Sequence, residues 1–189
     1  EQLISVRGGF PLAPPSQPLE PVDDLCVAPS TVTAGICPFI PLAGAPHTMS
    51  IWKKPISVEQ LTASGANTAV SHLGIELTEV GDDFLRGRVP VDERTRQPFG
   101  LLHGGVSVVL AETLGSMGAF YASPEGHRAV GLDINANHLR AATSGWVTGT
   151  ARPVHIGRTT QVWQIDMVND AGELTCVSRI TMAVLAPKG

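Results

Sequence analysis

Several features that define common protein classes are missing from this sequence of 189 residues. Its three cysteines form neither a disulfide framework nor a pattern such as Cys-x-x-Cys, so no metal site is expected. No apolar run reaches the about 18 residues that a membrane-spanning helix needs. With 13 Lys and Arg against 17 Asp and Glu, the net charge is −4. The basic residues are scattered and form no stripe of the kind that binds nucleic acid. These absences predict a soluble, cytoplasmic protein without a membrane or nucleic-acid partner.

The composition changes near residue 48. Residues 1–48 hold nine of the 15 prolines, no Lys and a single Arg, and they show no helical or strand period. We interpret them as a disordered or loosely ordered N-terminal extension that takes no part in the chemistry. The alternative is a regulatory or targeting tail. Residues 49–189 are expected to form one globular domain.

Within residues 49–189, one long helix is expected among strands of period two. Gly and Pro residues after residue 121 would end the helix, and turn residues separate the later apolar stretches. The expected helices cover residues 57–63 and 104–121, and the expected strands cover residues 75–80, 84–91, 129–140, 145–156, 160–168 and 174–185. This pattern predicts an α+β fold in which an antiparallel sheet wraps around a single central helix.

The expected long helix carries one carboxylate, Glu112, among small and apolar residues. Its helical neighbours include Gly105, Gly115, Ser116 and Ala119, which would leave room for a ligand beside the carboxylate. The opposite face would supply the larger core residues Val106, Leu110, Leu114 and Met117. Alternatively, the small residues only permit tight packing, and Glu112 is satisfied by a neighbouring group.

The residues before this helix are typical of an anion-binding site. Gly104 and Gly105 would expose unpaired N–H groups at the positive end of the helix dipole, where an oxyanion could be stabilised. His103 and Gln97 could hydrogen-bond to the same oxygen. Each also has a plainer interpretation, since His103 could simply cap the helix and Gln97 could be a solvated turn residue.

Spacing suggests that two chains share this site. Seven residues separate Gly105 from Glu112, so their backbones lie about 10 Å apart along the helix. A glutamate side chain cannot easily span that distance. A two-fold dimer would solve the problem if Glu112 of one chain faced Gly104 and Gly105 of the other.

The chain resembles the hotdog-fold acyl-CoA thioesterases over residues 49–185. The resemblance is to the branch with the Arthrobacter-type 4-hydroxybenzoyl-CoA and phenylacetate-pathway enzymes, and most of all to the 1,4-dihydroxy-2-naphthoyl-CoA thioesterases and enterobactin proofreading thioesterases. The residues that carry it are IWKK, HLGI, GDDFL, VPVDERTRQPFGLLHGGVSVVLAETLGSMG, VGLDINANHLR, HIGRTTQVWQI and CVSRITMAVL. It implies hydrolysis of acyl-CoA thioesters, with aryl-CoA as the expected substrate class.

The resemblance implies a role for each residue of the motif. Glu112 would be the catalytic nucleophile or general base, and the Gly104 N–H would be the oxyanion donor. Gln97 and His103 would position the thioester carbonyl, and Ser116 would help to hold the hydrolytic water.

The resemblance also implies contacts to coenzyme A, which is part of the substrate rather than a cofactor. Guanidinium groups such as those of Arg140 and Arg158 suit its phosphates. The implied contacts are Gly131, His138, Leu139, Arg140, Ala141, His155, Ile156, Gly157, Arg158, Thr159 and Thr160.

Three other functions remain open at the level of the sequence. INANHLR resembles the menaquinone-pathway enzymes, which prefer the CoA ester, whereas GSMG resembles the proofreading type, which acts on an aryl carrier protein. A hotdog hydratase or dehydratase would not need a carboxylate in the middle of the helix. An acyl-binding protein without turnover is the third. The resemblance further implies at least a homodimer, and a homotetramer built from two dimers.

Overall fold

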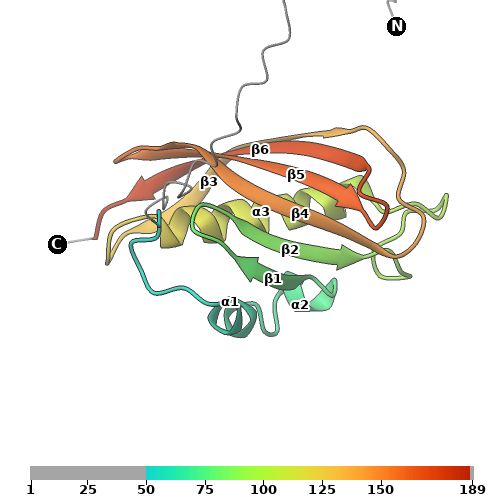
Figure 1. The fold of residues 1–189 in the computed structure, drawn as a ribbon, viewed down its shortest axis with the longest axis horizontal. Helices are drawn as coiled ribbons and strands as arrows, with labels where there is room; N and C mark the ends of the chain where they lie inside the picture. The colour runs from blue at the N-terminus through green and yellow to red at the C-terminus, as the bar shows by residue number, and fades with distance from the viewer. Residues whose placement is uncertain (1–49, 188–189) are drawn as a thin grey trace, which may run out of the picture. The chain divides into compact units, whose positions relative to one another are not determined.

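The computed structural model describes residues 50–187, so the expected N-terminal extension lies outside the described residues. This part of the chain contains three helices and six strands (Figure 1). In chain order they are α1 (Val58–Ser64), α2 (Ala69–His72), β1 (Glu76–Val80), β2 (Leu85–Pro90), α3 (Gly104–Tyr121), β3 (Arg128–His138), β4 (Trp146–Ile156), β5 (Thr160–Asn169) and β6 (Leu174–Leu185).

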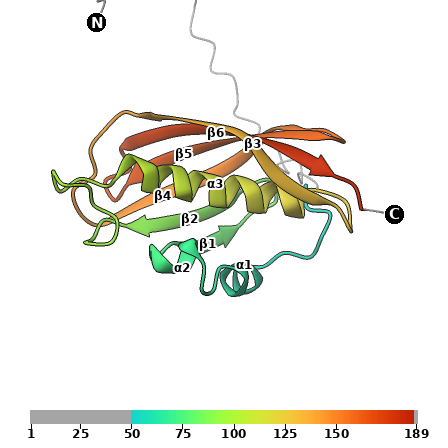
Figure 2. The same ribbon diagram turned by 180° about the vertical axis from the view of Figure 1, so that it is seen from behind.

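The six strands form a single antiparallel sheet in the order β1-β2-β4-β5-β6-β3. The long helix α3 lies along one face of this sheet (Figure 2) and contacts every strand from β2 to β6. Side chains of alternate strand residues meet α3 and form the buried core, among them Trp163, Ile165, Met167 and Ile180. The predicted α+β architecture, a sheet around one central helix, is therefore confirmed.

Every predicted helix and strand is confirmed to within two residues at each end. The first helix begins at Val58 because the Ser57 hydroxyl accepts a hydrogen bond from the Gln60 N–H, 3.3 Å away. The short helix α2 was not predicted. It is a single turn capped by Thr68 and Ser71, too short for a hydrophobic period to be visible.

Small residues bring α3 close to the sheet, which corrects one expectation. Gly115 and Ala119 were expected to leave space for a ligand, but both are buried against the sheet. A Cβ at Gly115 would overlap the Ile180 side chain, and one at Gly118 would lie 2.8 Å from the Trp163 ring. These glycines therefore serve close packing. No helix in residues 50–187 combines the length and apolar character needed to cross a membrane.

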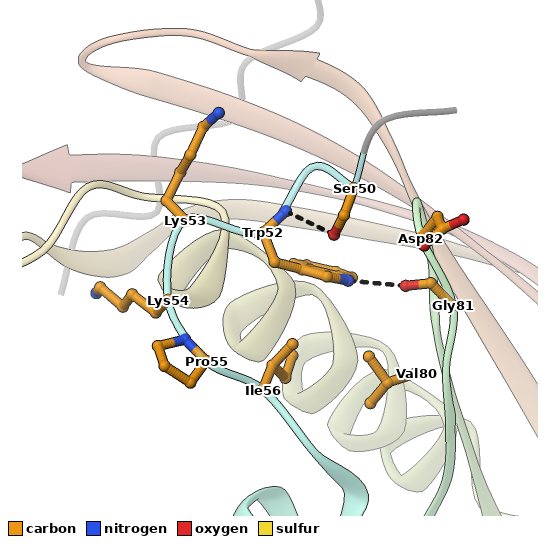
Figure 3. Close-up of a pocket in the computed structure, with 9 residues that line it drawn as sticks. All are labelled: Ser50, Trp52, Lys53, Lys54, Pro55, Ile56, Val80, Gly81 and Asp82. Carbon is orange, nitrogen blue, oxygen red and sulfur yellow. Dashed lines mark hydrogen bonds between the residues drawn. The ribbon is translucent and has the colours of Figure 1, made fainter. Parts of the chain in front are cut away.

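The segment before α1 ties the β1–β2 turn to the end of α3 (Figure 3). Trp52 donates from Nε1 to the Gly81 carbonyl at 2.7 Å, and its ring stacks on Trp163 with centroids 6.1 Å apart. Lys53 donates its backbone N–H to the Tyr121 carbonyl at 2.9 Å. Lys54 is buried, with Nζ 3.0 Å from the His127 carbonyl. These contacts fix the C-terminal end of α3.

Candidate active site

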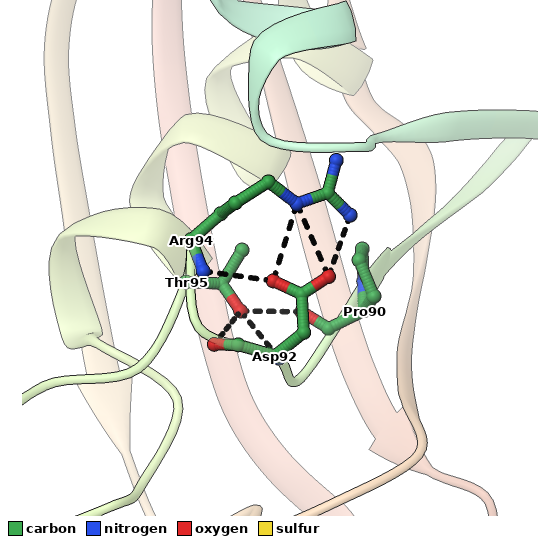
Figure 4. A network of polar contacts seen from close by, with 4 residues as sticks. All are labelled: Pro90, Asp92, Arg94 and Thr95. Atoms are coloured by element: carbon green, nitrogen blue, oxygen red, sulfur yellow. Dashed lines mark hydrogen bonds and ion pairs between the residues drawn. The ribbon is translucent and has the colours of Figure 1, made fainter.

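A hydrogen-bonded turn that follows β2 contains Asp92, Arg94 and Thr95 (Figure 4). Thr95 is buried, and its hydroxyl donates to the Pro90 carbonyl at 2.6 Å and accepts from the Asp92 N–H at 2.9 Å. Hydrogen bonds from the Arg94 guanidinium lower the pKa of the Asp92 carboxyl. The Thr95 carbonyl in turn accepts the His103 N–H at 2.8 Å. The turn therefore fixes the residue that caps α3.

The cap leaves one free backbone donor at the start of α3. His103 is the N-cap, and its Nδ1 accepts the Gly105 N–H at 2.9 Å. In residues 50–187 no acceptor is found for the Gly104 N–H. The expectation of two unpaired N–H groups is thus corrected to one, because the His103 ring uses the Gly105 donor. In the neutral ring this hydrogen bond places the proton on Nε2, which can donate to a ligand.

Gln97 lies in the loop before α3 with its side chain oriented by the backbone. Its Oε1 accepts the Phe99 N–H. Since the carbonyl of the carboxamide is used in this way, the NH₂ group is the part available to a ligand. The loop itself is closed by hydrogen bonds between Gln97 and Leu101 and between Gly100 and Gln97, at 2.8 and 2.9 Å.

A cavity of about 310 Å³, which we call the donor cavity, is lined by Gln97 and Gly104 but not by His103. The His138 ring lies against Gly104, where a Cβ would be 2.9 Å from His138 Nε2, so a side chain there would require the ring to move. The residues that line the donor cavity are Gln97, Leu101, Leu102, Gly104, Ser107, residues 138–142 and Thr175. The cavity therefore combines Gln97 and Gly104 with four of the expected coenzyme contacts, residues 138–141.

Glu112 lies in a different cavity of about 300 Å³, the carboxylate pocket. Its side chain is exposed, and Oε1 is 3.2 Å from the position that a Cβ at Gly131 would take. The pocket is completed by Leu132, Asp133, Ile134 and Ile180, beside an irregularity in the pairing of β3 with β6. The carboxylate pocket and the donor cavity share no lining residue. Eight residues of helix separate Gly104 from Glu112, a rise of about 12 Å.

Ser116 lies outside both cavities. It follows Glu112 by one turn, but its hydroxyl is 3.9 Å from the Met182 sulfur and faces the sheet. Ser116 therefore lies one helical turn from Glu112 without lining its pocket in the single chain.

Apart from Gly131, which lies beside Glu112 in the carboxylate pocket, the expected coenzyme contacts fall at two ends of the sheet. Residues 155–160 run from the end of β4 through the turn into β5, and Arg158 and Thr159 of the turn line a further cavity of about 460 Å³ with His127 and Arg128. Residues 138–141 begin with the last residue of β3, at its other end. The 11 residues of β3 span about 36 Å at roughly 3.3 Å per residue, so one chain cannot easily present both groups to one nucleotide.

Ser107, which lines the donor cavity, was not recognised in the sequence. It follows Gly104 by three residues, and this spacing places both on one face of a helix. That spacing was the available signal, but a serine in a mostly apolar helix gives no indication of a ligand by itself.

Comparison with known proteins defines the class. Residues 99–176 match the family described as the thioesterase superfamily. A protein of Escherichia coli K12 named 1,4-dihydroxy-2-naphthoyl-CoA hydrolase is 49% identical over 135 residues, which cover 71% of this chain and 99% of that protein. A Cronobacter turicensis protein named proofreading thioesterase EntH is 48% identical, over 71% of this chain and 98% of that protein.

Solved structures agree with this result. The crystal structure of thioesterase HI1161 from Haemophilus influenzae has a TM-score of 0.71 and 53% sequence identity, and it covers 72% of this chain and 95% of that one. The chain belongs to the thioesterase superfamily, with a hotdog fold. It is a thioester hydrolase. The expected enzyme type, a thioesterase, is therefore confirmed, in preference to a hydratase or a protein that only binds acyl groups.

Proposed function

We propose that the protein hydrolyses aryl-CoA thioesters at a site shared by two chains, with Glu112 of one chain acting on a carbonyl held by the other. The observation that carries this proposal is the separation of the donor cavity from the carboxylate pocket within one chain. Support for an aryl-CoA substrate comes from the relative named 1,4-dihydroxy-2-naphthoyl-CoA hydrolase.

The donor cavity would bind the thioester carbonyl. Its oxygen would accept hydrogen bonds from the Gly104 N–H and the Gln97 carboxamide, with the His103 Nε2–H as a further donor. These groups are fixed before substrate binds, so they can stabilise the negative charge that develops on the oxygen without reorganising. The positive end of the α3 dipole acts in the same direction.

Glu112 would supply the reacting oxygen in one of two ways. As a nucleophile, its carboxylate adds to the carbonyl carbon and the thiolate leaves, which forms a mixed anhydride that water then hydrolyses. As a general base, it removes a proton from water as the water attacks the same carbon. In both cases the products are a carboxylic acid and a free thiol. Ser116 remains a candidate to hold the water once the partner chain completes the site.

The sheet provides a route to the shared site. β3 is an edge strand, and in residues 50–187 only β6 pairs with it. If two β3 strands paired antiparallel about a two-fold axis, the start of each would lie beside the end of the other. Gly131 and Glu112 of one chain would then approach the end of the other chain's β3. The His138 and Gly104 of that other chain lie at this end.

The same arrangement would unite the two groups of coenzyme contacts. The 155–160 turn adjoins the start of β3, and residues 138–141 follow its end. Antiparallel pairing of the two strands would bring the turn of one chain toward residues 138–141 of the other. Arg158 and Arg140 would then both face the phosphates of one coenzyme A. Two such dimers would form the proposed tetramer, acting in the cytoplasm.

A second candidate substrate is an aryl group on a carrier protein. It is favoured by the relative named proofreading thioesterase EntH. The chemistry at the carbonyl would be unchanged, because a carrier protein presents its acyl group as a thioester of the same thiol arm. The two substrates would differ in the group that the enzyme binds beyond the thiol arm, which is a nucleotide in coenzyme A and a protein surface in the carrier.

A substrate panel tests the proposed function. Release of free thiol is measured with benzoyl-CoA, 1,4-dihydroxy-2-naphthoyl-CoA, a medium-chain acyl-CoA and an aroyl carrier protein. We expect kcat/KM to be highest for the two aryl-CoA esters. A clear preference for the medium-chain ester would refute the proposed substrate class, and a preference for the carrier protein would establish the second candidate.

A further inference from the structure

Ser107 places an unused hydroxyl in the donor cavity. The residue lies one helical turn after Gly104 and is only 5% exposed. No hydrogen bond of its side chain to another residue is found within residues 50–187, although no fully enclosed side-chain polar atom there lacks a partner. The Ser107 oxygen must therefore reach the cavity surface.

The usual partner of a helical serine is already occupied. A serine hydroxyl often donates to the carbonyl four residues earlier, which here belongs to His103. That carbonyl accepts the N–H groups of Val106 and Ser107 at 2.9 and 3.2 Å. The second hydroxyl of the cavity, on Thr175, donates to the Met167 carbonyl at 3.1 Å. Of the two hydroxyls that line the donor cavity, the one on Ser107 is thus available to a ligand.

The position of Ser107 relative to Gly104 indicates which ligand group it would contact. Residues three apart on a helix are about 5–6 Å from each other. In a coenzyme A thioester, the first amide nitrogen of the thiol arm is two carbons beyond the sulfur, a comparable distance from the carbonyl oxygen. Leu139 and Ala141 of the cavity wall belong to residues 138–141, which the proposed function assigns to coenzyme A. The arm would therefore pass Ser107 as it leaves the carbonyl site.

We propose that the Ser107 hydroxyl accepts a hydrogen bond from the amide N–H nearest the sulfur of the thiol arm. This inference rests on the proposed function and adds a binding residue to it. It also gives a reason for selectivity, since a site that hydrogen-bonds a polar group discriminates against an analogue that lacks it.

Two small thioesters that differ in one atom test the inference. The benzoyl thioester of N-acetylcysteamine has the amide N–H, whereas that of 2-mercaptoethyl acetate has an ester oxygen in its place. With the Ser107→Ala variant, kcat/KM for the first should fall about three- to tenfold, the worth of one neutral hydrogen bond. The value for the second should stay within twofold of wild type.

Two further variants separate hydrogen bonding from packing. Ser107→Thr keeps a hydroxyl at this position and should preserve the preference for the amide substrate. Thr175→Val removes the other hydroxyl of the cavity. It should change kcat/KM for both substrates by the same factor, because the Thr175 hydroxyl is bound to the backbone. Thermal denaturation shows that each variant is folded.

The outcomes separate this inference from the proposed function. If Ser107→Ala lowered kcat/KM equally for both thioesters, the inference would be refuted while thioester hydrolysis stood. The Ser107→Ala variant could instead change only the ratio of kcat/KM between the 2-hydroxybenzoyl and benzoyl esters of one thiol. Ser107 would then contact the acyl group, and the inference would be wrong. Failure of the wild-type protein to cleave any aryl thioester would refute the proposed function, and this inference with it.

Discussion

Replacing Glu112 with alanine should reduce thioester hydrolysis on the order of 100-fold or more and leave the fold intact. The large loss is expected because the carboxylate supplies nucleophilic or general-base catalysis. The fold should survive because Glu112 is exposed and, within residues 50–187, forms neither an ion pair nor a hydrogen bond to another side chain. Its removal leaves no buried group without a partner.

A second carboxylate of the same pocket provides the control for the Glu112→Ala variant. Asp133 also lines the carboxylate pocket, but it lies on β3 rather than on α3. Asp133→Asn should cost far less activity than Glu112→Ala if the position of the carboxylate matters rather than the charge alone. Thiol release from benzoyl-CoA and melting temperature are measured for both variants. Near-normal turnover by a folded Glu112→Ala protein would refute the proposed mechanism.

Mixing two inactive variants should restore activity. One variant is Glu112→Ala, which keeps the donors, and the other combines Gln97→Ala with His103→Ala, which keeps the carboxylate. In a heterodimer, one site would contain the intact donors of the first chain and the intact Glu112 of the second. Random assembly makes about half of the dimers mixed, each with one intact site of two, so about a quarter of wild-type activity is expected.

Subunit exchange has to be verified for this experiment to be decisive. The two variants are unfolded and refolded together, and the mixed dimer is identified by native mass spectrometry. Each variant refolded alone provides the baseline for thiol release. If mixed dimers form and activity stays at that baseline, each active site lies within one chain.

The sequence predicted the central helix well because its ends are marked by particular residues. Gly104 and His103 mark the start, and Pro124 and Gly126 follow the end. The later strands were equally visible, since alternate residues such as Trp163 and Ile165 face the core. The donor groups Gln97 and Gly104 were also found from their chemistry, and they do line one cavity.

Other features could not be predicted from periodicity. A helical period separates the faces of α3 but does not say which one the sheet covers, and small residues can serve either a ligand or close packing. Contact with Ile180 decides this for Gly115. The use of the Gly105 N–H by His103 depends on a side-chain orientation that the sequence does not specify. The distance between the two groups of coenzyme contacts depends on the strand order, which links residues far apart in the chain.

The most direct test of the shared site is a crystal structure with a ketone analogue of benzoyl-CoA. In this analogue a CH₂ group separates the carbonyl from the sulfur, so it cannot be hydrolysed. We predict that its carbonyl oxygen lies about 3 Å from the Gly104 N of one chain. The carboxylate nearest the carbonyl carbon should be Glu112 of the other chain. A carbonyl that contacts Gly104 and Glu112 of the same chain, or that lies away from Gly104, would contradict the account.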